Sequence, residues 1–333
     1  MPPRHPRPIA SPVLDSIRPV IESSRHVRTD EARIAEVARW LAYEELPFPD
    51  FGLPAGEGGT RDEAIDFAFT QICVNTAFTD FRTGQKFEVE EDGQRLSDSI
   101  AMIACLKRAL ARGVPVDDGA CLAAMTRVEL AGIFAGSIEM PMLDEKRAVL
   151  NEAGRTLVAR HGGRFHRFLA TCSPRLYDSG NGLVERLVAE FPRFDDVSRY
   201  DGHLARFYKL AQLFYWMLHC GLRRQGGFRI DDIASMTAFA DYIVPAALRV
   251  LGILVYDGRL ERRIQAGEEV PRDSEDEIEI RAHTLHATAL LTEAINALRP
   301  RDRQVIIPQI DARLWVSYHA THWPHHLTRT IMY

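Results

Sequence analysis

Asp241 is a carboxylate inside an apolar and aromatic stretch, Thr237-Ala-Phe-Ala-Asp-Tyr-Ile-Val-Pro245, which is typical of the start of a buried helix. An aspartate in such surroundings is costly to ionise unless a partner pairs with it or a reaction uses it. The structural alternative is that Asp241 stabilises the first helical turn through the helix dipole and free backbone N–H groups. Its bulky neighbours Phe239 and Tyr242 favour the wall of a polar pocket.

Lys209 is a second charge in an apolar segment, Phe207-Tyr-Lys-Leu-Ala-Gln-Leu-Phe-Tyr-Trp216. Its side chain could lie along apolar surface with the ammonium in water. Because apolar residues cover the neighbouring helical faces, a carboxylate or a bound phosphate is at least as good an explanation. Asp232, followed by Ile-Ala-Ser235, competes with Asp241 as a catalytic acid but looks more like a helix cap.

Glu277-Ile-Glu279-Ile-Arg281 interleaves charges with isoleucine. Glu277 and Arg281 are four residues apart, and an exposed pair at this spacing contributes only a few tenths of a kcal/mol. If the same helical face turns inward, the donors of Arg281 suit a phosphate or a second carboxylate.

Composition limits the class of protein. A net charge of -5 over 333 residues argues against general nucleic-acid binding, for which domains usually have a pI above about 9. The five cysteines are scattered and never spaced as Cys-x-x-Cys, which favours a reducing compartment. Neither a signal peptide nor an apolar run approaching the roughly 18 residues of a membrane helix is recognisable. We therefore expect a soluble cytoplasmic protein with no membrane association.

The sequence gives little support for a metal or an organic cofactor. His319 and His322 could share a helical face, but Pro324 interrupts the helix and no acidic or cysteine ligand lies close by. There is no glycine-rich phosphate loop, Gly-x-Ser-x-Gly motif or dinucleotide fingerprint. We expect no metal and no cofactor.

The segments that must position these charges are mostly helical. Residues 1–12 are rich in proline and arginine and are expected to be flexible, and 13–333 is expected to be one compact, mainly α domain. Phe87 to Leu96 alternates and carries Asp92-Gly93, which predicts one small β-hairpin. Thr29 and Ser274 are expected helix caps. Helices are predicted over 98–112, 117–134, 143–161, 183–190, 204–222, 231–254 and 275–298.

Taken together, the chain resembles the queuosine 5′-phosphate N-glycosylase/hydrolase family, the queuosine salvage proteins. The order and spacing of the short motifs carry the resemblance, which runs nearly end to end. The main pieces are Ser24-Arg25-x-Val27, Val74-Asn75-x-x-Phe78, Phe207-Tyr208-Lys209-x-Ala211-Gln212, the Asp232–Pro245 segment, Glu277-x-Glu279-Ile280-Arg281, and Pro324-x-His326-x-x-Arg329-x-Ile331-x-Tyr333.

The resemblance implies hydrolysis of the N-glycosidic bond of queuosine 5′-monophosphate, with release of queuine for salvage into tRNA. It also implies a fold similar to helix-hairpin-helix DNA glycosylases, with Ala240-Asp241 in the place of the Ala-Asp that follows their hairpin. Lys209 would be the charged residue across the cleft. The expected partner is the small nucleotide, without a stable nucleic-acid complex.

The residues suit that chemistry. Glycosidic cleavage develops positive charge on the sugar, which a carboxylate such as Asp241 can stabilise or attack, while Lys209 and Asp232 are the other catalytic candidates. Which carboxylate does which job stays open. The expected substrate-binding residues are Asn75, Phe78, Tyr208, Phe239, Tyr242, Glu277, Glu279, Arg281, His326, Arg329 and Tyr333. A non-catalytic helical module that binds a modified nucleotide or tRNA is the alternative.

Overall fold

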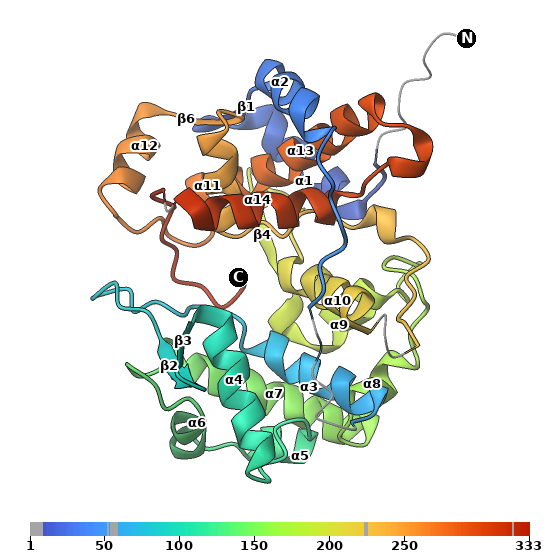
Figure 1. Ribbon diagram of the computed structural model, residues 1–333, viewed down its shortest axis with the longest axis vertical. Helices are drawn as coiled ribbons and strands as arrows, with labels where there is room; N and C mark the ends of the chain where they lie inside the picture. The colour runs from blue at the N-terminus through green and yellow to red at the C-terminus, as the bar shows by residue number, and fades with distance from the viewer. Residues whose placement is uncertain (1–8, 52, 54–58, 223–225, 322) are drawn as a thin grey trace.

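The computed structural model describes residues 9–51, 53, 59–222, 226–321 and 323–333. Helices dominate these residues, which confirms the mainly α class. They gather into two halves, and the chain builds part of the first half, then the second, and then returns to complete the first (Figure 1). The site described below is made where the halves face each other.

The first half joins the two ends of the chain. Its helices are α1 (Pro12–Ser23), α2 (Glu31–Leu41), α11 (Ile243–Val250), α12 (Gly258–Gln265), α13 (Glu275–Leu298) and α14 (Ile307–Thr321), with the 3-10 turn η4 (Arg301–Arg303). Its largest apolar cluster includes Ile34, Val244, Leu291 and Leu314, so that α2, α11, α13 and α14 share one core. This burial fixes α11 and α14 beside each other.

The second half is made from the middle of the chain. Its helices are α3 (Arg61–Cys73), α4 (Asp98–Ala111), α5 (Gly119–Ala124), α6 (Arg127–Ile133), α7 (Leu143–His161), α8 (Phe165–Leu169) and α9 (Leu183–Glu190). The 3-10 turns η1 (Pro192–Phe194) and η3 (Ile233–Ser235) and helix α10 (Lys209–Gly221) connect it to the first half. Phe69 and Phe165 stack in its core with ring centroids 4.1 Å apart. Phe214 of α10 packs on the same rings, which ties α10 to this half.

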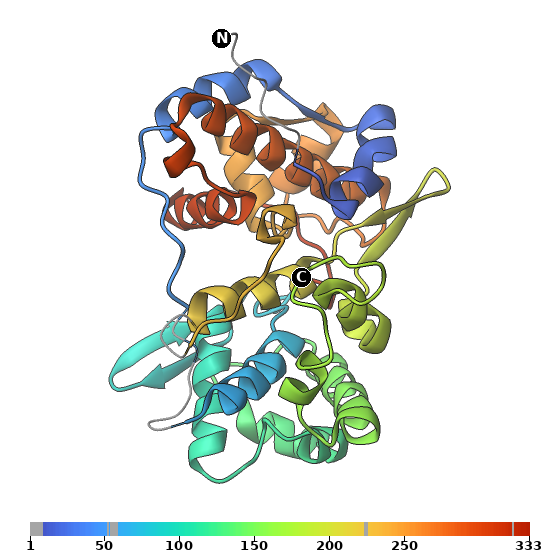
Figure 2. The same ribbon diagram turned by 90° about the vertical axis from the view of Figure 1, so that its right-hand side faces the viewer.

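The predicted hairpin is confirmed as β2 (Glu88–Glu91) and β3 (Gln94–Ser97). Asp92 and Gly93 at its turn have φ of 49° and 74°, as a tight hairpin turn requires. The expectation of a single hairpin was wrong. β4 (Val197–Tyr200) pairs with β5 (His203–Arg206) in a ribbon that stands out from the side of the molecule (Figure 2). β1 (Val27–Thr29) pairs with β6 (Leu254–Tyr256), which is far from it in the sequence.

Three of the predicted helices have the boundaries that the structure shows. The predictions 143–161, 183–190 and 275–298 coincide with α7, α9 and α13. The other long predictions were too long: 117–134 divides into α5 and α6, 204–222 begins with β5, and 231–254 contains η3 and α11. Thr126 caps α6 in the middle of the first of these ranges and so explains that division.

Two predicted caps have different outcomes. The Ser274 hydroxyl accepts from the Glu277 backbone N–H at 3.3 Å, as expected. Thr29 instead lies in β1, and Asp30 caps α2. At the N-terminus, residues 1–8 of the segment expected to be flexible lie outside the described residues. Ile9 donates its backbone N–H to Glu293, and α1 begins at Pro12.

Among the described residues, no helix is both long and apolar enough to cross a membrane.

Candidate active site

Asp241 lies immediately before α11 and uses its two carboxylate oxygens differently. Oδ1 accepts from the backbone N–H groups of Ile243 at 2.7 Å and Val244 at 3.3 Å. Oδ2 lies 3.6 Å from Nζ of Lys209. The helix-cap explanation and the charged-partner explanation are therefore both correct. The carboxylate is only 9% exposed, and one oxygen remains directed at a cation.

Lys209 is the first residue of α10, where apolar side chains surround it. Tyr208 precedes it in the left-handed conformation, with φ of 48°, which turns the chain sharply into the helix. Burial lowers the pKa of the Lys209 ammonium, and the carboxylates of Asp241 and Asp311 oppose that effect. The charged form of the buried lysine is thus favoured by two acids, of which Asp241 is in direct contact.

Asp311 is a third member of this cluster that the sequence analysis missed. It lies on α14, and its Oδ2 accepts from the Phe239 backbone N–H at 2.8 Å. Burial raises its pKa to about 7, with Asp241 adding to the rise and Lys209 opposing it. A signal was present in the sequence, because Asp311 shares the apolar stripe of Ile307 and Leu314 at helical spacing.

Arg281 holds the backbone next to Asp241. On α13, it donates through Nε to the carbonyl oxygen of Ala240 at 3.0 Å. Its two terminal nitrogens donate to the two oxygens of Asp196, at 2.9 and 2.5 Å. Both side chains are almost fully buried. Because the Asp196 carboxylate also accepts from the Lys209 backbone N–H at 3.3 Å, one buried ion pair fixes the positions of both Asp241 and Lys209.

Aromatic and acidic groups complete the surroundings of Arg281. Its guanidinium carbon lies 4.0 Å from the ring centroid of Phe207 and 4.4 Å from that of Tyr333. Tyr333 donates its hydroxyl to Glu277 at 2.9 Å. Burial raises the pKa of Glu277. The charge of Arg281 and the hydrogen bond from Tyr333 oppose this rise. The C-terminal segment therefore closes over the centre of the molecule, where Figure 1 places the C-terminus between the two halves.

The chain was compared with known proteins. The family model described as "Queuosine salvage protein" matches residues 57–333. The chain belongs to the queuosine salvage protein family. The curated queuosine 5′-phosphate N-glycosylase/hydrolase of Sphaerobacter thermophilus is 35% identical over 325 residues, which is 96% of this chain and 97% of that protein. The proteins of the same name from Bos taurus and Mus musculus are each 27% identical, over 96% of this chain and 98% of theirs. The resemblance drawn from the motifs is confirmed.

In this member of the queuosine salvage family, two of the acids predicted for the site accept hydrogen bonds from the backbone of other segments. Glu279 accepts from the N–H groups of Arg25, His26 and Val27 at 2.7 to 3.0 Å and from the Tyr200 hydroxyl at 2.7 Å. These four donors occupy its carboxylate. Its role as a partner for the substrate's amine and diol stays a prediction that the present contacts do not favour.

Asp232 has a similar role in another loop. Its carboxylate accepts from the backbone N–H groups of Leu176 at 2.6 Å and Tyr177 at 3.3 Å. It stands at the N-cap position of η3, where we expected a cap, but its side chain makes no capping hydrogen bond. The carboxylate of Asp232 thus stabilises a loop, whereas the carboxylate of Asp241 has Lys209 as a charged partner.

The predicted aromatic residues are divided between two places. Phe78 is buried in the second half, and Nζ of Lys146 lies 5.5 Å from its ring centroid. Asn75, three residues before it, is half-buried just beyond the end of α3. In the first half, Tyr242 stacks on His325 with ring centroids 4.5 Å apart. Phe239 is buried, and its backbone N–H donates a hydrogen bond to Asp311.

The predicted C-terminal cations differ in exposure. His326 is buried with Nε2 3.5 Å from the Tyr333 hydroxyl, and burial lowers its pKa to about 3, so that its ring is neutral at physiological pH. Arg329 is exposed and lies 3.4 Å from Glu145. In the described part of the chain, no group of three or more His, Cys, Asp or Glu side chains is arranged to hold a metal ion. His322 of the histidine run lies outside the described residues.

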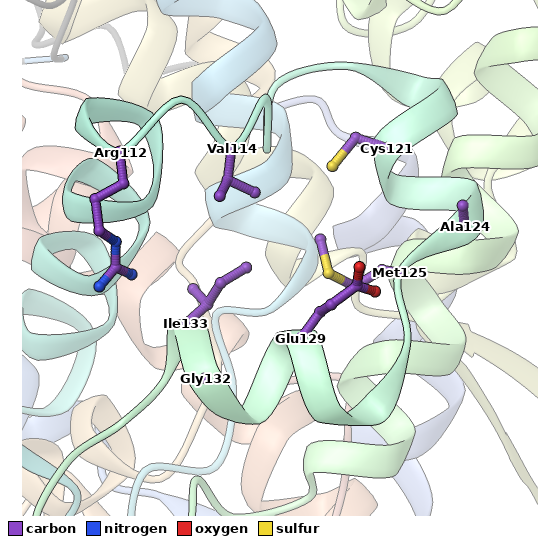
Figure 3. Close-up of a pocket in the computed structure, with 8 residues that line it drawn as sticks. All are labelled: Arg112, Val114, Cys121, Ala124, Met125, Glu129, Gly132 and Ile133. Atoms are coloured by element: carbon purple, nitrogen blue, oxygen red, sulfur yellow. The ribbon is translucent and has the colours of Figure 1, made fainter.

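A separate hollow lies in the second half, between α4, α5 and α6 (Figure 3). Arg112, Cys121, Glu129 and Ile133 are among its lining residues. None of the predicted site residues lines it, and burial raises the pKa of the Cys121 thiol, which keeps it protonated. This hollow is therefore distinct from the cluster around Asp241.

Proposed function

We propose that this chain hydrolyses the N-glycosidic bond of queuosine 5′-phosphate to give free queuine and ribose 5-phosphate. The observation that carries the proposal is the buried Asp241–Lys209 pair, 3.6 Å apart, in a member of the queuosine salvage family. The relatives named queuosine 5′-phosphate N-glycosylase/hydrolase match nearly the whole chain, so that the proposed reaction is the one their name states.

Asp241 has the arrangement that the transition state needs. As the C1′–N bond breaks, positive charge develops on the ribose, and a nearby carboxylate stabilises it by charge or by transient bonding. Oδ1 is anchored to the start of α11, so that the carboxylate cannot rotate away. Lys209 offsets the cost of keeping its negative charge buried.

Water must supply a hydroxyl to C1′ and a proton to the departing base. Asp311, whose pKa lies at about 7, can exchange a proton near neutral pH. We assign to Asp241 the stabilisation of the sugar cation and to Asp311 the proton transfer. Lys209 opposes the rise in the pKa of Asp311 that burial causes, which keeps this acid able to exchange a proton near neutral pH.

Binding roles follow from placement. Phe78 in the second half and Phe239 and Tyr242 in the first half offer apolar rings for the base, and Asn75 and Tyr208 are further binding candidates. Glu277, His326 and Tyr333 form a buried polar group that borders Arg281. Arg281 itself is committed to Asp196, which favours a positioning role over direct phosphate binding. The likeness to helix-hairpin-helix glycosylases, the cytoplasmic location and the absence of a stable nucleic-acid complex remain parts of this proposal.

The test is direct. Purified protein is incubated with queuosine 5′-phosphate, and free queuine is followed by mass spectrometry beside Asp241→Asn and a control, Asp231→Asn, which alters an exposed acid. We expect release by the wild type and the control and loss of release in Asp241→Asn. Guanosine 5′-monophosphate tests the base specificity. Tight binding without release by any variant would support the non-catalytic binding module instead.

A further inference from the structure

Arg193 is a buried cation whose hydrogen-bonding capacity is largely unused. It lies in η1, and its side chain is 3% exposed. Nε donates to the carbonyl oxygen of Cys73 at 2.8 Å. Neither terminal nitrogen has a hydrogen-bond partner among the described residues. Since burying an unpaired guanidinium is costly, a ligand that meets these donors would be strongly stabilised there.

The acid nearest in sequence cannot fill that role. Asp196 lies three residues further along the chain, but its two oxygens already receive both terminal nitrogens of Arg281 and the Lys209 backbone N–H. Burial lowers the pKa of Arg193 to about 10, and the positive charge of Arg272 contributes to the decrease while Asp196 opposes it. The guanidinium is therefore charged and undercompensated.

A second buried cation, Lys146, binds the same turn as Arg193, the turn that follows α3. Lys146 of α7 is 1% exposed and donates through Nζ to the carbonyl oxygens of Ala77, at 3.0 Å, and Pro141, at 2.6 Å. Arg193 and Lys146 thus bind the two ends of the Cys73–Ala77 turn that follows α3. Ala77 has φ of 47°, a conformation that few non-glycine residues adopt without support.

Electrostatics connects this pair to the reaction centre. Burial, together with the charge of Arg193, lowers the pKa of Lys146 to about 7, and Glu145 opposes the decrease. The charge of Arg193 also acts on Lys209, whose pKa it helps to lower. Arg193 thus repels both Lys146 and Lys209, and of these three buried cations only Lys209 has a salt bridge to a carboxylate among the described residues.

We propose that Arg193 and Lys146 form a binding site for a phosphate monoester dianion. Resting on the proposed function, the site takes the 5′-phosphate of the nucleotide while Asp241 acts on the sugar. The two free nitrogens of a guanidinium fork match two phosphate oxygens, and a dianion balances two cations. Water would meet the hydrogen bonds but leave the charges uncompensated, so that the chemistry favours an anion.

Kinetics with paired substrates tests the site. Arg193→Met is compared with the wild type and with Arg199→Met, an exposed control, on queuosine 5′-phosphate and on queuosine. We expect KM for the phosphorylated substrate to rise about 10- to 100-fold in Arg193→Met, with KM for the nucleoside unchanged, because charged hydrogen bonds are lost. Equal changes for both substrates, or none, would overturn the proposal.

Binding of inorganic phosphate tests the site without turnover. Wild-type protein in sodium phosphate should have a higher Tm than in sodium chloride of equal ionic strength, and Arg193→Met should lose most of this difference. Calorimetry near pH 7.5 in two buffers of different ionisation enthalpy should detect proton uptake on phosphate binding, because a dianion raises the pKa of Lys146. Lys146→Met should lose that uptake.

The outcomes separate the two proposals. If the wild type releases no queuine but phosphate binds through Arg193, the proposed function fails and the anion site stands. If the wild type is active and phosphate gives neither a Tm difference nor proton uptake, the site is wrong and the function stands. Arg193→Lys keeps the charge without the fork, so it should retain part of the phosphate response if Arg193→Met proves unstable.

Discussion

Asp241 and Lys209 face each other from the starts of two different helices, with Oδ2 and Nζ 3.6 Å apart. Asp241 precedes α11 in the first half of the molecule, and Lys209 begins α10, which packs on the second half. The distance between these two atoms therefore depends on how the two halves are placed relative to each other. Any change that moves one half relative to the other should alter this distance before it disturbs the apolar core of either half.

Lys209→Met should reduce turnover strongly while leaving the fold in place. The substitution keeps the apolar stem and removes the ammonium, so that Asp241 and Asp311 lose the positive charge that acts on both. We expect kcat to fall by about 10²- to 10³-fold, as for loss of a charged group at a reacting centre. Steady-state kinetics with queuosine 5′-phosphate measures this, with circular dichroism as the folding control. Unchanged kcat would exclude an electrostatic role for Lys209.

Asp311 should make stability depend on pH in a particular direction. Its pKa is raised from the ordinary value of 3.8 to about 7. Between about pH 4 and pH 7 the folded protein therefore keeps a proton that the unfolded chain has lost, so this group's contribution to stability falls as pH rises through that window and is level above it. The full effect is at most about 4 kcal/mol.

Asp311→Asn removes that dependence, and the comparison isolates it. The stability of the variant relative to the wild type should rise between pH 5 and pH 8, as measured by urea unfolding at both values. Turnover of queuosine 5′-phosphate by the variant should be lower than that of the wild type at both pH values. A constant difference in unfolding free energy across this range would show that Asp311 does not titrate there, and proton transfer would then have to be assigned to another group.

Arg281→Lys should destabilise the protein although it keeps the charge. Lysine cannot reproduce the two bonds to Asp196 together with the bond to the Ala240 carbonyl. Breaking a buried pair costs about 3–5 kcal/mol, whereas the exposed Arg329→Lys control should change stability by less than about 0.5 kcal/mol. Chemical denaturation compares the two. Similar values for both would mean that the Asp196 pair contributes little.

The sequence made some parts of this site visible because they break a local pattern. Lys209 and Asp241 are charges in apolar segments, and that conflict singles them out without any knowledge of the fold. Asp311 breaks the same kind of pattern on α14 and could have been found. Asp196 could not, because it follows another aspartate in a short connection, where acids are usually solvated, and only the packing of α13 brings Arg281 to it.

The errors in the fold do not share one cause: the missed β4–β5 hairpin is local and turns at Asp201-Gly202, whereas the β1–β6 pair is not local. The hairpin at Asp92-Gly93 is local and was predicted, whereas β1 and β6 are far apart in the chain, so that no local pattern indicates their pairing. Continuous apolar composition suggested one helix over 231–254, but Asp241 accepts from Ile243 and Val244 and so begins α11 there. A residue that we propose for the reaction centre also sets the helix boundary.

Glu279 provides the last prediction, because its contacts argue against the binding role that its motif suggested. Its carboxylate joins the Arg25–Val27 backbone to α13 and accepts the Tyr200 hydroxyl, all within 3.0 Å. Glu279→Gln keeps the shape but replaces an acceptor with an NH2 donor, leaving at least one buried N–H unpaired at a cost of about 1–3 kcal/mol. We expect a lower free energy of unfolding with KM for queuosine 5′-phosphate unchanged. A raised KM at unchanged stability would instead place Glu279 against the substrate, and the β1–α13 junction would then have to open when the nucleotide binds.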